Sequence, residues 1–179
     1  IIWAGTAEGL ARYDKSKIKE ITDFGGFRDS EIKFMELGNN NEIWFASEFG
    51  IWRFNTKTQN NDFYETENEI KAFNLIDGTP WIGSSDGAYF FNGISWGKAN
   101  SFGANIFTTP KIIGDKKKSI YYQSASGIHR KTLDGKWEDF SSNGFFEGET
   151  FNIIPGIFED FDGNIWFSGW SRTEKNIVA

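Results

Sequence analysis

The chain has 179 residues, a formal net charge of −6 and a pI of about 4.9. This length allows one domain with a buried core, and the acidic balance argues against nucleic acid as a partner, because phosphate backbones are bound by clustered lysines and arginines. The absence of cysteine excludes disulfides and thiolate chemistry, and no stretch of this chain is apolar enough to span a membrane, so any membrane attachment would lie in segments outside it.

A repeated unit runs along the whole sequence. The first copy reads Ile-Trp-Ala-Gly-Thr over 2–6 and then Gly-Leu-Ala-Arg-Tyr-Asp over 9–14. Each copy has an aromatic anchor, and the anchors are Trp3, Trp44, Trp81, Tyr121 and Trp166. A glycine follows six residues after each of the first four anchors, whereas the anchors themselves are 41, 37, 40 and 45 residues apart. A constant inner spacing with a variable outer spacing predicts equivalent strands joined by loops of different length.

Turn residues divide each unit into four short strands. In the second unit we expect an apolar strand over 32–37, a turn over 38–41, the anchor strand over 43–47 and a third strand from 50. Asn, Asp and Gly at these turns tolerate the positive φ that tight hairpins require. Four strands in about 40 residues predict a propeller blade, and no segment has the uninterrupted periodicity of a helical solenoid. We therefore expect an all-β chain, a partial β-propeller over 1–179 with about four four-stranded blades.

The two ends of the sequence carry the same strand of the unit. In a closed ring of four blades, residues 2–6 and 165–169 would compete for one position. We therefore expect the natural chain to continue in both directions as a larger propeller. A small five-bladed ring with one incomplete blade is the alternative.

The repeat resembles the two-component regulator propeller repeat. Residues 2–14 carry the second half of that motif, and Glu-Asp-Phe-Asp-Gly-Asn-Ile-Trp over 159–166 carries the first half. The resemblance implies the extracytoplasmic sensor region of a bacterial hybrid histidine kinase, located in the periplasm or outside the cell, which recognises an oligosaccharide or another small ligand. Similar repeats occur in a propeller protein of type IX secretion, so the alternative is a protein-interaction scaffold, with a homodimer or a protein as partner.

The tryptophans that do not recur at the same place in every unit are the candidate ligand contacts. The anchors are expected to pack blades together, and Trp96 and Trp137 follow equivalent turns and are also expected to be structural. This leaves Trp52 and Trp170 as candidate stacking surfaces, with Arg53 and Arg172 as polar partners.

The sequence contains no recognisable catalytic or metal-binding motif. The single imidazole, His129, aligns with Ala11, Trp52 and Tyr89 of the other units, which favours a packing role. The Asp-rich turn over 160–164 lacks the glycine and glutamate positions of a helical calcium loop. We therefore expect no cofactor, no metal and no enzymatic activity, with a lyase or hydrolase propeller as the least favoured interpretation.

Overall fold

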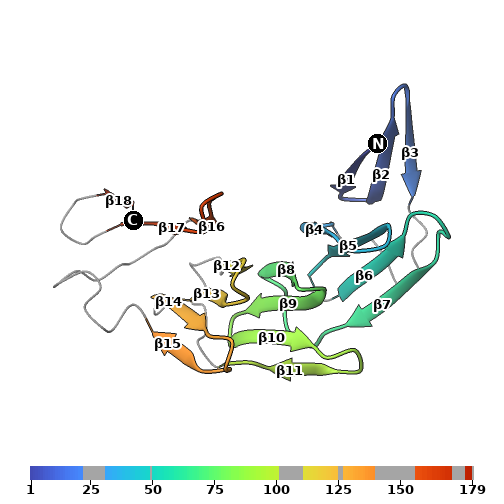
Figure 1. Cartoon of the computed structure of the whole chain (residues 1–179). Helices are drawn as coiled ribbons and strands as arrows, with labels where there is room; N and C mark the ends of the chain where they lie inside the picture. The colour runs from blue at the N-terminus through green and yellow to red at the C-terminus, as the bar shows by residue number, and fades with distance from the viewer. Residues whose placement is uncertain are drawn as a thin grey trace.

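The computed structural model describes residues 1–21, 31–48, 50–100, 111–124, 127–139, 156–170 and 176–178. All secondary structure assigned in these segments is β-strand, and the strands form five antiparallel sheets. The sheets follow one another along an open arc in chain order (Figure 1). The expectation of an all-β propeller chain is confirmed. We call the sheets blades 1 to 5.

Three of the five blades have four strands, ordered in space as they are in the chain. Blade 2 contains β4 (Phe34–Leu37), β5 (Glu42–Ala46), β6 (Gly50–Asn55) and β7 (Asn61–Glu65). Blade 3 contains β8 (Ala72–Ile76), β9 (Thr79–Ser84), β10 (Gly87–Phe91) and β11 (Trp96–Lys98). Blade 4 contains β12 (Lys111–Gly114), β13 (Ile120–Ser124), β14 (Gly127–Lys131) and β15 (Trp137–Asp139).

The two end blades have three strands each. Blade 1 contains β1 (Ile2–Thr6), β2 (Gly9–Asp14) and β3 (Lys17–Ile21), and blade 5 contains β16 (Gly156–Glu159), β17 (Ile165–Trp170) and β18 (Asn176–Val178). The first strands of neighbouring blades, β4, β8, β12 and then β16, contact one another in succession, so they form the inner side of the arc.

The turns between strands have the chemistry that the sequence predicted. Asp77 and Gly78 join β8 to β9 with φ values of 51° and 75°, and Gly163 turns the chain between β16 and β17 with a φ of 85°. Positive φ is easy for glycine and tolerable for Asn and Asp, so these residues allow the tight reversals that the short strands need.

The hydrophobic core consists of layers between successive blades rather than one central cluster. The layer between blades 1 and 2 has Leu10, Ile43, Phe45, Trp52 and Phe54 at its centre. Between blades 2 and 3 lie Trp44, Ile51, Phe73 and Ile82, and between blades 3 and 4 lie Trp81, Ala88, Ile112 and Tyr122. Both faces of each inner sheet are therefore buried, which explains why strands such as β5 are continuous apolar runs rather than alternating ones.

Hydrogen bonds from tryptophan side chains also join blades 3 and 4 to the blade before each of them. The indole N–H of Trp96 donates to the carbonyl of Glu65 at 3.0 Å, and the indole of Trp137 donates to the carbonyl of Ala99 at 3.1 Å. Both tryptophans begin the outermost strand of their blade, so the same contact recurs one unit later.

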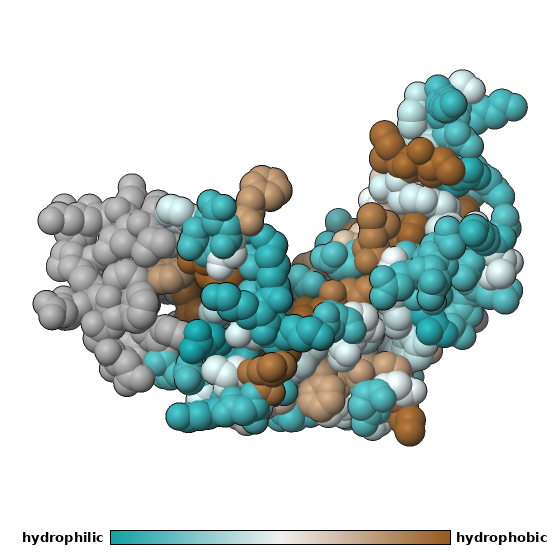
Figure 2. All heavy atoms as spheres, in the orientation of Figure 1, coloured by the Kyte–Doolittle hydropathy of each residue, from teal (hydrophilic) through white to brown (hydrophobic). Residues whose placement is uncertain are grey.

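The anchors of the inner blades are buried, whereas the anchor of blade 5 is not. Trp44 and Trp81 are 6% and 4% exposed, but Trp166 is 38% exposed. Blade 1 also exposes apolar side chains, including Ile2 and Ile18, and Figure 2 shows a hydrophobic patch over this sheet. Within the described residues, no helix has the length and apolarity needed to cross a membrane.

Candidate functional site

Two adjoining hollows lie between blades 2 and 3. The first has a volume of about 530 Å³ and is lined from blade 2 by Trp44, Arg53 and Tyr64 and from blade 3 by the segments 78–80 and 90–93. The second has a volume of about 730 Å³ and is lined from blade 2 by residues 63–68 and from blade 3 by Tyr89, Phe91 and residues 94–96. We call them the Arg53 hollow and the Trp96 hollow. Tyr64 and Phe91 line both.

Arg53 is held in place by the strands on either side of it. It lies on β6, opposite Trp44 of β5 and Asp62 of β7. Its Nε and Nη2 atoms donate to Oδ2 of Asp62 at 3.0 and 2.6 Å, and its guanidinium carbon lies 5.8 Å from the centre of the Trp44 ring. The hydrogen bond with Asp62 raises the pKa of Arg53, so its charge is retained. Nη1 is 4.0 Å from Glu42, which leaves its N–H donors without a close hydrogen bond to a described residue.

A row of aromatic rings connects the two hollows. Trp44 stacks on Tyr64 with ring centres 5.8 Å apart, and Tyr64 lies 4.7 Å from Phe91. Phe91 in turn lies 5.2 Å from Trp96. Trp44 is buried, whereas Tyr64, Phe91 and Trp96 are half-buried and therefore present part of each ring to the hollows. Such rings offer surfaces on which a flat or ring-shaped ligand could stack.

The polar groups of the Arg53 hollow are fixed by its turns. Asn92 accepts two hydrogen bonds at its side-chain oxygen, from the backbone N–H groups of Ile94 and Ser95, both at 2.9 Å. These bonds orient the side-chain amide so that its NH₂ group is the part left to bind a ligand. Gly93 has a φ of 96°, which glycine adopts without strain.

Of the predicted site residues, one lines a hollow, one is buried, and two have side chains outside the described part of the chain. Arg53 lines a hollow, but its neighbour Trp52 does not: Trp52 is 2% exposed and stacks on Phe45 at 5.4 Å, with Phe63 4.6 Å away on its other side. A ligand that stacked on Trp52 would have to displace one of these rings. Trp170 ends β17, but its side chain lies outside the described part of the chain, as does all of Arg172. Ligand binding by Trp170 and Arg172 stays a prediction.

Several residues of the hollows were not singled out in the sequence. Tyr64 lies outside the recurring motif, Phe91 and Asn92 occupy the positions of Tyr13 and Asp14 in it but were not proposed as ligand contacts, and Trp96 was expected to be structural. Trp96 does serve that role through its bond to Glu65, and its ring also lines the larger hollow. The available signal was the concentration of aromatic residues in the third and fourth strands of units 2 and 3.

His129 lies in the interior of blade 4. It is fully buried, opposite Tyr122 on β13 and Asp139 on β15. Burial lowers the pKa of His129, and the Asp139 carboxylate, 3.7 Å from Nδ1, partly opposes this. A neutral, buried imidazole at this place packs between blades and reaches neither hollow.

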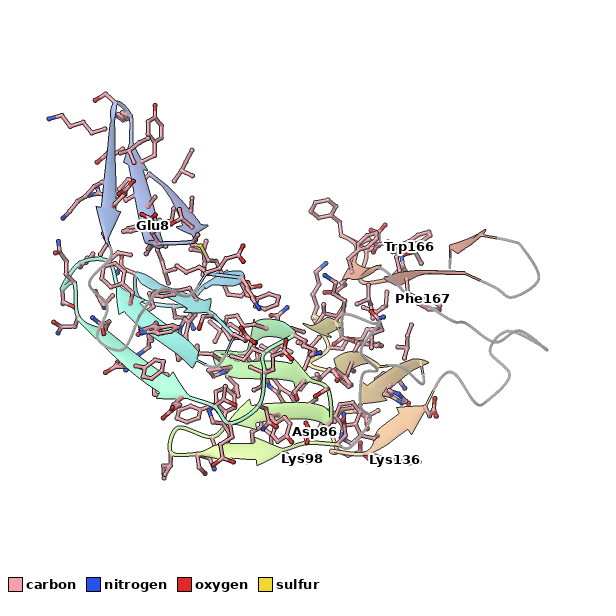
Figure 3. The ribbon with its side chains drawn as sticks, turned by 180° about the vertical axis from the view of Figure 1, so that it is seen from behind. Glu8, Asp86, Lys98, Lys136, Trp166 and Phe167 are labelled. Carbon is pink, nitrogen blue, oxygen red and sulfur yellow. The ribbon has the colours of Figure 1, made fainter. Side chains whose placement is uncertain are left out.

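A second polar cluster surrounds Asp86 in the turn between β9 and β10 (Figure 3). Its carboxylate accepts hydrogen bonds from Ser84 at 2.9 Å, Tyr89 at 2.5 Å and Lys98 at 3.0 Å. Burial alone would raise the pKa of Asp86, but these hydrogen bonds lower it to about 2. Within the described segments, no group of three or more His, Asp or Glu side chains is placed to hold a metal ion.

Comparison with protein-family models and with curated proteins finds no match. Among solved structures, the extracellular domain of a protein described as the hybrid two component system BT3049 from B. thetaiotaomicron aligns with a TM-score of 0.72 and 19% identity over 99% of this chain. Virginiamycin B lyase from Staphylococcus aureus aligns with a TM-score of 0.67 and 15% identity over 97% of this chain. The chain folds as β-propeller blades. It spans 27% of the first protein and 63% of the second.

These likenesses bear on three expectations: the repeat family, the compartment and the absence of enzymatic activity. The hybrid two-component domains, which also include that of BT4673 at 18% identity, belong to the class of protein whose repeat the sequence resembles, so the resemblance is confirmed at the level of the fold. Their extracellular location agrees with the expected compartment. The expectation that this chain is not an enzyme is contradicted. The neighbours also include lyases and a protein described as a gluconolactonase, so this fold carries enzymes as well as extracellular domains of two-component proteins.

Proposed function

We propose that this chain belongs to an extracytoplasmic sensor propeller of a two-component regulatory system, and that the Arg53 hollow binds its ligand, a glycan or another small polar molecule. The observation that carries the proposal is one hollow between two blades that combines half-buried rings with anchored hydrogen-bond donors. The structural likeness to extracellular domains of two-component proteins supports the sensor role.

The chemistry of the hollow suits a sugar. One face of a sugar ring is lined by C–H groups that pack on an aromatic ring, and its hydroxyl groups accept and donate hydrogen bonds at the edge. Tyr64 and Phe91 supply the rings, while Nη1 of Arg53 and the amide of Asn92 supply donors. Because Asp62 and Glu42 lie beside the guanidinium, its net field is weak, and a neutral ligand suits it better than an anion.

The position of the hollow suggests how binding would be transmitted. Its walls come from two blades, so a ligand that contacts both stabilises the arrangement in which they lie together. Binding shifts a conformational equilibrium only through such a difference in affinity between two arrangements. The signalling segment would respond to the altered packing of the propeller, directly or through a protein partner or homodimer.

The test is a panel of neutral oligosaccharides, screened by thermal shift and followed by calorimetry on the best candidate. Arg53→Met is compared with Arg12→Met, a matched control, because Arg12 occupies the same place opposite Trp3 and pairs with Asp14. We expect Arg53→Met to weaken binding by about tenfold, the effect of one hydrogen bond to a charged group. Arg12→Met should bind as the unmodified chain does. The absence of any oligosaccharide ligand, or equal affinity in the two variants, would overturn the proposal.

A further inference from the structure

The Trp96 hollow differs from the Arg53 hollow in the charge at its edge. Aromatic side chains line it from both blades: Phe63, Tyr64, Tyr89, Phe91 and Trp96. The lining also includes Ile94, which is 90% exposed, and two exposed glutamates, Glu65 and Glu67. A hollow with this many rings and two acidic groups has the composition that binds cations.

Neither glutamate is paired with a cation from the part of the chain that the structure describes. No lysine or arginine of the described residues forms an ion pair with Glu65 or Glu67. Glu69, two residues further along the same loop, is different, because its carboxylate lies 3.4 Å from Nζ of Lys71. The negative charge of Glu65 and Glu67 is therefore available to a ligand, and that of Glu69 is not.

One of the rings that line the hollow, Tyr89, already has a cation beside it. Nζ of Lys98 lies 5.5 Å from the centre of the Tyr89 ring, within the range of a cation–π contact. This lysine is bonded to Asp86 at 3.0 Å, so its charge is balanced and it does not neutralise Glu65 or Glu67. Tyr64, Phe91 and Trp96 have no such cation among the described contacts.

We propose that the Trp96 hollow binds an organic cation, an alkylated ammonium group attached to an apolar body. The ring faces attract the positive charge, Glu65 and Glu67 add a longer-range attraction, and the exposed Ile94 side chain packs against the apolar part. An alkylated ammonium is suited to this place because it is weakly hydrated, so it leaves water at little cost. A volume of about 730 Å³ accommodates a ligand much larger than the ammonium group itself.

The test compares choline with dimethylbutanol, its neutral isostere in which carbon replaces the nitrogen, by calorimetry on the whole chain. We expect choline to bind at least about tenfold more tightly than the alcohol, because only the cation gains the ring and carboxylate attraction. The double variant Glu65→Gln, Glu67→Gln should lose most of this preference and most of its dependence on salt concentration. Both side chains are exposed at their position, so the fold is expected to tolerate the change.

Two control variants show whether choline binding depends on these two carboxylates. Glu69→Gln removes an equal charge from the same loop and should leave choline binding unchanged, since that carboxylate is paired with Lys71. Arg12→Met, on blade 1, should also leave it unchanged, and because no part of this test uses Arg53, a failure of the glycan proposal would not affect the result. Equal affinities for choline and dimethylbutanol, no measurable choline binding, or an equal loss in Glu69→Gln would each overturn the inference.

Discussion

A comparison of Trp81→Ala with Trp166→Ala measures how much packing against the following blade adds to the contribution of an anchor tryptophan to the free energy of unfolding. The two residues occupy the same position in the repeat unit, but Trp81 is 4% exposed between blades 3 and 4 and Trp166 is 38% exposed. Removing a fully buried large aromatic side chain costs about 3–5 kcal/mol of unfolding free energy. We expect Trp81→Ala to lie in this range.

The difference between the two variants follows from their exposed fractions. An indole side chain buries up to about 250 Å², so a gap of about one third of its surface corresponds to ~85 Å² of apolar area, or ~2 kcal/mol. Trp166→Ala should therefore cost about 2 kcal/mol less than Trp81→Ala. Urea unfolding followed by far-ultraviolet circular dichroism measures both, since this signal reports mainly on the backbone. An equal or greater cost for Trp166→Ala would refute the view that the anchors stabilise the chain mainly by packing against the following blade.

Three further predictions concern contacts around blades 3 and 4. The pKa of Asp86 is about 2 in the folded chain, below its ordinary value, so its hydrogen bonds stabilise the fold above pH 4, and this contribution is lost as the pH falls towards 2. In Asp86→Asn, the free energy of unfolding should therefore decrease less between pH 4 and pH 2 than in the unmodified chain, by ~1 kcal/mol or less because the side chain is half exposed. Gly114→Ala would place a Cβ against the Cγ2 methyl of Ile76 on blade 3 and should cost about 1–3 kcal/mol in urea unfolding. Gly156→Ala should cost less, because among the described atoms its Cβ would meet nothing closer than Ser168 Oγ at 3.4 Å, and equal costs would contradict the close packing of blades 3 and 4. Lys131→Met removes an ammonium group 5.3 Å from the centre of the Trp81 ring and should lower the melting temperature by an amount equivalent to about 0.5–1 kcal/mol, while Lys136→Met, on the exposed turn of the same blade, should leave it unchanged (Figure 3).

The architecture could be predicted from the sequence because it is encoded locally. The interval from each anchor to the following glycine places two strands and a turn within about ten residues, and Asp77-Gly78 marks a reversal by its own backbone preference. These signals do not depend on which blade lies next to which. They therefore survive in a single sequence, and the strands lie where the spacing predicts them.

The site could not be predicted in the same way, because it is formed between two units. Trp52 and Arg53 are adjacent on β6, so their side chains point to opposite faces of blade 2: Trp52 towards blade 1 and Arg53 towards the hollow at blade 3. Both faces of an inner blade are covered, so hydrophobicity does not show which face borders a hollow. Tyr64 and Trp96 line the same hollow from two different blades, and no local motif joins them.

The measurement that tests the central claim most directly is a crystal structure of the chain with the oligosaccharide that binds best in the screen. We expect the sugar in the Arg53 hollow, with one ring against Tyr64 and Phe91 and a hydroxyl group within hydrogen-bond distance of Arg53 Nη1. A sugar bound at any other place on the propeller, with the Arg53 hollow filled only by water, would contradict the assignment of this hollow as the ligand site.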